Sequence, residues 1–171
     1  MKLYCFGESG HSYKAALALQ LSEIDWTPIF VDFFNGETRS EQYRNQINEM
    51  GEAPVLVDGD TKLTQSGVIQ NYLFNKTGKH GGRDEAEKLE ILRWVLWDNH
   101  KLSSFAGNTR FLMNFFPQDR RPQPVIDFNL ARLKGSYGIL EKALIGKDFL
   151  VGDDITHADM TCCSYLYYPE P

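Results

Sequence analysis

The sequence has few cysteines and no long apolar run. Its 171 residues include three cysteines, Cys5, Cys162 and Cys163, and none of them belongs to a C-x-x-C pair. Neither a disulfide framework nor a zinc site is indicated, and this cysteine usage fits a reducing cytoplasm. The longest apolar stretch, about residues 15–19, is too short to span a membrane, and the N-terminus lacks the apolar stretch of a signal peptide. We therefore expect a cytoplasmic protein with no metal and no membrane partner.

Positive charge is also scarce. The chain has 18 Lys and Arg against 23 Asp and Glu, which gives a net charge of −5 and an isoelectric point near 5.4. A nucleic-acid-binding surface needs clustered Lys and Arg, so nucleic acid is not an expected partner. The length allows one large domain or two small ones, with enough material for a core.

The first part of the chain alternates between β-rich and helical patterns. The β-rich runs are residues 2–6, 26–33, 54–57 and 62–64. Helical patterns lie in 12–21 and 66–76, and the polar segment 35–48 indicates a loop and a short helix. We expect Ser12 to cap the first helix, because a serine side chain can accept a hydrogen bond from the first helical N–H groups. The order β-α-β, then α, then a β-hairpin and a helix predicts a mixed sheet with helices on both faces.

A polar, glycine-rich break at residues 77–82 separates this part from the rest. Such breaks are typical of domain boundaries. We predict a first domain over residues 1–78, a linker over 79–83 and a second domain over 84–171. After the break no strand pattern remains, so the second domain is expected to be all helical.

Capping signals mark two of the helices expected in the second domain. Asp84 and Glu87 have the spacing of a capping box before a long helix, and Thr156 and Asp159 have the same spacing before another. A further long helix is expected over residues 125–144.

Pro54 is the residue that says most about function. Proline cannot donate to a β-ladder, so at the head of a strand it indicates an edge or a special turn, often with a cis peptide bond. A cis bond would turn the carbonyl and N–H groups of Ala53 away from the sheet, where they can pair with an extended peptide. Gln65 and Ser66 begin the next helix, whose N–H groups and hydroxyl can bind a carboxylate. Together these features indicate a small acidic peptide as ligand.

Three motifs in this order resemble the glutathione transferase superfamily. They are the strand start Glu52-Ala53-Pro54, the step Gln65-Ser66-Gly67-Val68-Ile69, similar to E/Q-S-x-A/V-I, and the Thr156-x-x-Asp159 box. The resemblance implies a thioredoxin-like N-terminal domain with a mixed four-stranded sheet (α/β), followed by an all-α helical-bundle domain. Family members normally continue through further helices, so we expect the C-terminal domain to be truncated at 169–171.

The loop over residues 8–14 resembles the serine-type active-site loop of the zeta and tau classes, S-x-x-S-x-R/K. The resemblance implies that reduced glutathione is bound, as substrate or cofactor, with Ser9 as the catalytic serine and Ser12 as the capping one within the glutathione site. A thiol pKa of about 8.5 must fall by about two units, which needs roughly 2.7 kcal/mol. One charge-assisted hydrogen bond of about 1.5–3 kcal/mol can supply most of that. From the residues alone, the catalytic role of Ser9 and the alternative that it is a plain loop residue are equally supported, and His11 is expected to be a bystander.

The resemblance also implies the other contacts with glutathione. Gln65 is expected to bind the γ-glutamyl ammonium and Ser66 its carboxylate, although Ser66 would also fit a plain helix N-cap. Ala53, held by Pro54, is expected to pair through its main chain with the cysteinyl residue. The pocket for the second substrate is expected near three residues after the first long helix of the second domain: Phe105, Arg110 and Phe111.

The function implied is transfer of glutathione to a small hydrophobic electrophile by a homodimer, as is usual in the family. Two alternatives remain open. The zeta-like loop also suits a glutathione-dependent isomerase of the maleylacetoacetate type, which returns glutathione unchanged. Transferase-like domains also serve as non-catalytic binding modules, although Ser9, Pro54, Gln65 and Ser66 argue against that here.

Overall fold

The computed structural model describes residues 1–168, which form two compact units. The first is Met1–Gly81 and the second begins at Gly82, so the division falls inside the segment 79–83. Within the described residues, no helix has both the length and the apolar character needed to cross a bilayer.

The first unit contains a four-stranded sheet in the order β2-β1-β3-β4. Its elements are β1 (Lys2–Cys5), α1 (Gly10–Leu21), β2 (Thr27–Phe30), a 3₁₀ turn (Glu37–Arg39), α2 (Glu41–Gln46), β3 (Val55–Asp58), β4 (Thr61–Thr64) and α3 (Ser66–Thr77). β1 is parallel to β2 and antiparallel to β3, and β3 forms an antiparallel hairpin with β4. The predicted mixed sheet and thioredoxin-like order are confirmed.

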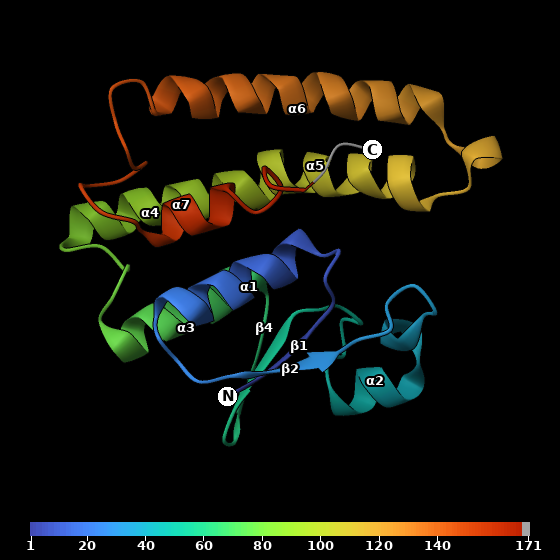
Figure 1. Cartoon of the computed structure of the whole chain (residues 1–171), viewed down its shortest axis with the longest axis horizontal. Coiled ribbons are helices and arrows are strands. Elements are labelled where there is room, and N and C mark those ends of the chain that lie inside the picture. The colour runs from blue at the N-terminus through green and yellow to red at the C-terminus, as the bar shows by residue number, and fades with distance from the viewer. Residues whose placement is uncertain (169–171) are drawn as a thin grey trace. The chain divides into compact units, whose positions relative to one another are not determined.

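Apolar side chains between the sheet and two helices form the core of this unit. Helices α1 and α3 pack side by side (Figure 1). Leu3 and Leu56, which are paired across β1 and β3, are completely buried, as are Leu19 of α1 and Ile69 of α3. Burial of each such side chain contributes about 1.5–3 kcal/mol. This packing positions the N-terminal ends of the two helices, and the candidate site lies at those ends.

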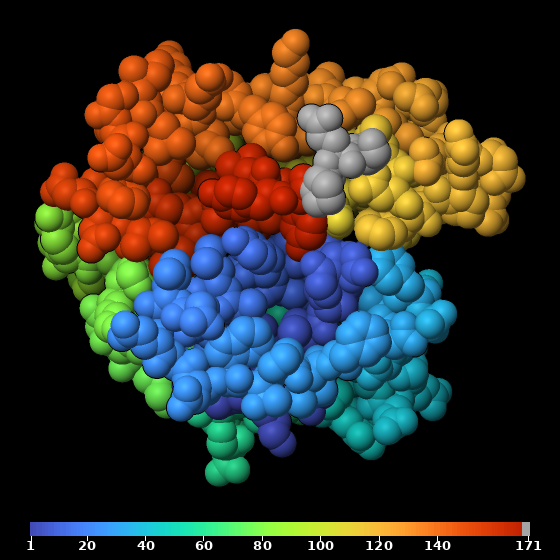
Figure 2. Space-filling view, viewed as in Figure 1, coloured from blue at the N-terminus to red at the C-terminus, as the bar shows by residue number. Residues whose placement is uncertain are grey.

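The second unit is entirely helical within its described part. It comprises α4 (Glu85–Trp97), a π-helical segment (Asp98–Leu102), α5 (Ser103–Arg110), a second π-helical segment (Phe111–Phe115), a 3₁₀ turn (Gln118–Arg120), α6 (Gln123–Ala143) and α7 (His157–Cys162). Helix α6 runs alongside α5, and α7 lies against α4 (Figure 1). Figure 2 shows α6, in orange, at the surface of this unit. Its core includes Trp94, Leu133 and Cys162.

One predicted helix start and one predicted capping-box contact differ from those observed. Ser9, not Ser12, is the N-cap of α1, and its Oγ accepts a hydrogen bond from the Ser12 N–H at 3.1 Å. The prediction was wrong because the helix already begins at Gly10, which places Ser12 inside the first turn. Asp84 caps α4 as expected, accepting from the Glu87 N–H at 2.9 Å. The Glu87 carboxylate, however, accepts from the backbone N–H of Arg83 and not from that of Asp84.

The predicted capping box at the start of α7 is confirmed. Asp159 Oδ2 accepts from the N–H and the hydroxyl of Thr156, at 2.8 and 2.9 Å. Its Oδ1 accepts from the N–H of Leu150 at 2.7 Å. Leu150 belongs to the helical core, so Asp159 both caps α7 and fastens the preceding loop to it.

Asp159→Ala is expected to destabilise the protein by roughly 2–4 kcal/mol. The estimate adds the loss of a cap, about 1 kcal/mol, to an unsatisfied N–H of Leu150, about 1–3 kcal/mol. Urea unfolding followed by far-ultraviolet circular dichroism measures the change. Asp148→Ala, at an exposed position, is the control and should change stability by less than about 0.5 kcal/mol. Equal midpoints for the two variants would contradict this role of Asp159.

Candidate functional site

Ser9 lies where the chain leaves the sheet and enters α1. Its N–H donates to the carbonyl of Phe6 at 3.2 Å, and its side chain is 9% exposed. As the N-cap, Ser9 Oγ accepts a bond from the Ser12 N–H and keeps its own proton. The hydroxyl can therefore donate to an anion that also lies near the positive end of α1. Ser12 takes a different position, since its buried hydroxyl has no hydrogen-bond partner among residues 1–168.

The start of α3 has an unusual backbone conformation. Gln65 is the N-cap residue, with φ of 67° and ψ of 119°, and within residues 1–168 no side chain caps this helix. A non-glycine residue at such φ costs of order 1–3 kcal/mol and is often found at functional sites. Ser66 is the first helical residue, so the alternative that it is the N-cap is wrong. The first N–H groups of α3 are thus available to a carboxylate.

His11 connects the starts of the two helices. Its Nδ1 lies 3.3 Å from Ser66 Oγ. Burial lowers the pKa of His11 to about 4, and the positive charge of Lys14 adds to the effect. The ring is therefore neutral near pH 7. His11 was expected to be a bystander; its contact with Ser66 joins residues 55 positions apart and left no signal in the local sequence.

A second contact joins the same two helices one turn further along. Gln70 of α3, which is completely buried, donates from Nε2 to the backbone carbonyl of Lys14 at 3.2 Å. The Lys14 side chain is also completely buried. These polar residues hold α1 and α3 at a set position along one another, so the starts of both helices face a common region. The sequence offered one clue to them, since Lys14 and Gln70 each stand beside apolar core residues, Ala15 and Ile69.

Two buried side chains fix the loop before β3 through hydrogen bonds to its backbone. The Glu52 carbonyl accepts from Tyr43 Oη at 3.0 Å and from Asn48 Nδ2 at 2.9 Å. Burial, together with the nearby charge of Glu37, raises the pKa of Tyr43 to about 12, so its hydroxyl remains a donor. The Ala53–Pro54 peptide bond is cis. No other residue among 1–168 forms a hydrogen bond with the backbone of Ala53.

An aromatic cluster, not expected from the sequence, adjoins the Ser9 loop. Phe6 and Phe33 stack with ring centroids 4.6 Å apart, and Phe34 meets both rings edge-on. Phe6 and Phe33 are half-buried and Phe34 is 44% exposed. Because Phe6 also accepts the Ser9 N–H bond, the cluster places an apolar surface beside the catalytic candidate.

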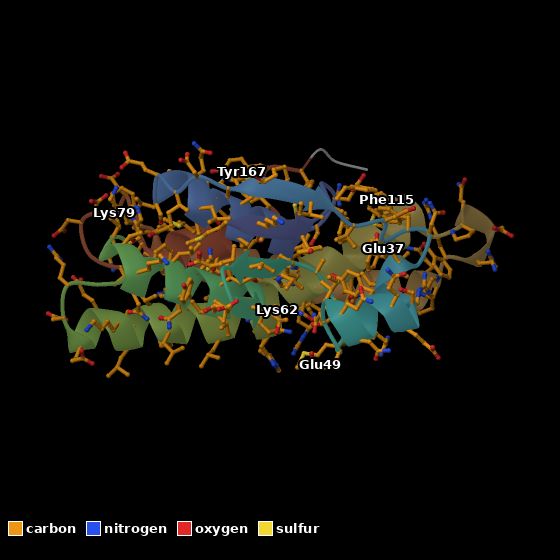
Figure 3. The ribbon with its side chains drawn as sticks, turned by 90° about the horizontal axis from the view of Figure 1, so that it is seen from below. Glu37, Glu49, Lys62, Lys79, Phe115 and Tyr167 are labelled. Atoms are coloured by element: carbon orange, nitrogen blue, oxygen red, sulfur yellow. The ribbon has the colours of Figure 1, made fainter. Side chains whose placement is uncertain are left out.

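The three predicted pocket residues of the second unit have different neighbours. Phe105 lies against Phe128 and under the guanidinium of Arg132, both on α6. Arg110 lies 4.0 Å from the ring centroid of Tyr168 and 5.2 Å from that of Phe115, a residue labelled in Figure 3. Phe111 is 41% exposed and contacts Phe116. The described contacts do not join these three residues to one another, so their assignment to the pocket of the second substrate stays a prediction.

Comparison with known proteins gives matches to both halves of the chain. The family model of the glutathione S-transferase N-terminal domain matches residues 1–75, and that of the C-terminal domain matches residues 109–171. Glutathione S-transferase F14 of Arabidopsis thaliana is 26% identical over 166 residues, which cover 94% of this chain and 65% of that protein. Glutathione S-transferase 1 of Triticum aestivum is 29% identical over 178 residues, covering 95% of this chain and 77% of the relative.

Solved structures agree with these sequence matches. The crystal structure of a possible glutathione S-transferase from Rhodopseudomonas palustris superposes with a TM-score of 0.89 at 26% identity, over 97% of this chain and 75% of the other. The chain thus spans about two thirds to three quarters of the length of these three proteins. With both domain models matched in order and the same fold in a solved relative, the chain belongs to the glutathione S-transferase superfamily.

Proposed function

We propose that this chain binds reduced glutathione and activates its thiol for attack on a small hydrophobic electrophile. One observation carries the proposal. The His11–Ser66 contact brings the N-terminal ends of α1 and α3 together, so the hydroxyl of Ser9 and the N–H groups of α3 serve the same ligand. A sulfur and a carboxylate of one small peptide are the anionic groups that such an arrangement suits.

Ser9 stabilises the thiolate. Its hydroxyl donates a hydrogen bond to the sulfur, and the positive end of α1 adds to the effect. Since the Ser9 oxygen already accepts the Ser12 N–H bond, its O–H is polarised toward the sulfur. The thiolate then attacks the electrophilic carbon, the S–C bond forms, and the leaving group departs with the electron pair of its bond. The thiol proton passes to solvent.

The rest of the tripeptide lies along the remaining polar groups. The γ-glutamyl carboxylate accepts hydrogen bonds from Ser66 and the first N–H groups of α3, and the side chain of Gln65 lies beside the ammonium. The backbone of Ala53 pairs with the cysteinyl residue. His11 keeps the Ser66 side chain in position.

The electrophile is apolar in this proposal. The half-exposed rings of Phe6, Phe33 and Phe34 support it from the first unit. Phe105, Arg110 and Phe111 are kept as further candidates. The amount of glutathione consumed per product distinguishes transfer from the isomerase alternative. Transfer consumes one glutathione per product, and isomerisation consumes none.

We also propose a homodimer in the cytoplasm. Leu89, Leu92 and Leu96 of α4 are 67%, 50% and 61% exposed. Their spacing places them on one helix face, and an exposed stripe of this kind is typical of a protein interface. A reducing compartment suits the chemistry, because it keeps glutathione in the thiol form that is activated here.

Ser9→Ala should lower the activity by roughly a hundredfold, because the thiol pKa returns toward about 8.5 and little thiolate forms near neutral pH. The thiolate absorption that appears when glutathione is added to the wild type should be lost. Affinity by isothermal titration should change little, since the carboxylate contacts remain. Ser9→Thr keeps a hydroxyl and should recover much of the activity. If Ser12→Ala abolished the thiolate band while Ser9→Ala did not, Ser9 would be the wrong serine.

His11 should make stability pH-dependent in a defined window. Its folded pKa of about 4 lies below the ordinary 6.5, so the unfolded chain binds the proton more readily between these values. The free energy of unfolding is highest above about pH 6.5 and falls, by up to about 3 kcal/mol, as the pH drops to about 4. The difference in stability between wild type and His11→Asn, measured by urea unfolding from pH 4 to 8, isolates this effect. A constant difference across that range would rule it out.

Leu92→Arg should convert the proposed dimer to a monomer, because a charged side chain cannot be buried in an apolar interface without large cost. Sedimentation equilibrium of the wild type should give twice the chain mass of 19.6 kDa. Leu130→Arg, at a 41% exposed leucine of α6, is the control and should leave the mass unchanged. A wild-type mass equal to that of one chain would refute the homodimer.

A further inference from the structure

The carboxylate of Glu52 lies against the residue that begins α3. Gln65 Nε2 donates to Glu52 Oε2 at 2.8 Å, and both side chains are exposed. A carboxylate only accepts hydrogen bonds, so the amide nitrogen of Gln65 must be the atom that faces it. The amide oxygen, Gln65 Oε1, therefore points away from Glu52. The pair offers two acceptors to a ligand, this amide oxygen and the carboxylate.

The backbone beneath Glu52 has little freedom. Its carbonyl receives the hydrogen bonds of Tyr43 and Asn48, whose side chains are 2% and 1% exposed. The preceding residue, Gly51, has φ of +68°, and a Cβ there would lie 2.8 Å from the Thr38 carbonyl oxygen. Only glycine fits, so the chain approaches Thr38 closely at this point. A carboxylate carried on such a loop is positioned before any ligand arrives.

The conformation of Gln65 places the hydrogen-bond acceptors of the Glu52–Gln65 pair beside the N–H donors at the start of α3. Its backbone, at φ of 67°, leads into the uncapped N–H groups of α3, while its side chain turns to Glu52. An α-amino acid end group carries a carboxylate and an ammonium on one carbon. The N–H groups suit the carboxylate, and the Glu52–Gln65 pair suits the ammonium.

We propose that Glu52 is a specificity-determining residue that recognises the α-ammonium of the γ-glutamyl group, with the amide oxygen of Gln65 as second acceptor. The inference rests on the proposed glutathione site and adds to it a preference for tripeptides with a free terminal amine. Tripeptides whose terminal amine is absent or acylated are bound weakly. Gln65 alone, a neutral amide, does not supply the negative charge that this selection needs.

The test is a cycle of isothermal titrations on the full chain. Wild type, Glu52→Gln and Glu49→Gln are each titrated with glutathione and with glutaryl-Cys-Gly, which lacks only the amine. Glu49, labelled in Figure 3, is exposed and three residues away, which makes it a matched control for loss of one negative charge. Circular dichroism verifies that the variants are folded.

Wild type is expected to prefer glutathione about tenfold or more, the effect of a charged hydrogen bond reduced by solvent exposure. Glu52→Gln should bring this preference to about twofold or less, with the affinity for glutaryl-Cys-Gly unchanged. Glu49→Gln should keep the wild-type preference. A preference that survives in Glu52→Gln, or an equal loss for both ligands, would overturn the role of Glu52 and leave the proposed function intact. No binding of glutathione by the wild type would overturn the proposed function and this role with it.

Discussion

The candidate site depends on how α1 and α3 are joined. Two polar contacts, Gln70 to the Lys14 carbonyl and His11 to Ser66, connect segments 56 and 55 residues apart in the chain. Buried polar groups must find partners, and a partner at one place on a helix sets how far that helix can slide along its neighbour. The apolar packing of Ala15, Ala18 and Ile69 tolerates small shifts, whereas these hydrogen bonds do not. These two contacts between α1 and α3 therefore determine the positions of Ser9 and Ser66 relative to one another.

The polar groups of the site cost stability that the core offsets. The left-handed backbone of Gln65 and the buried hydroxyl of Ser12, which has no hydrogen-bond partner among residues 1–168, are each unfavourable for folding. They lie at the starts of α3 and α1, so these unfavourable terms are located at the candidate site, apart from completely buried core residues such as Leu19 and Leu73. Such a distribution is what separates a binding region from the rest of a fold.

The second unit has its own buried polar centre. Asp98, completely buried, accepts from Ser103 at 2.7 Å and from Thr161 at 3.0 Å, and so joins the end of α4, the start of α5 and α7. It lies in a π-helical segment, and a second one follows α5. Each π turn rotates the residues that follow it relative to a continuous α-helix. Phe105 and Arg110 both lie in α5, between these two segments, and their spacing along an α-helix turns their side chains about 140° from one another. Phe105 therefore faces α6 while Arg110 lies among other rings.

The sequence by itself determined the order of elements, the two-domain division and the motifs around Pro54, Gln65 and Asp159, because these depend on local patterns of polarity and on turn and capping residues. It placed the cap of α1 three residues late, since Ser9 and Ser12 are both plausible caps and only the packed helix decides between them. The contacts of His11, Tyr43 and Glu52 were decided by the tertiary structure alone. Each joins residues that folding brings together, and such a contact leaves no periodic trace in the chain.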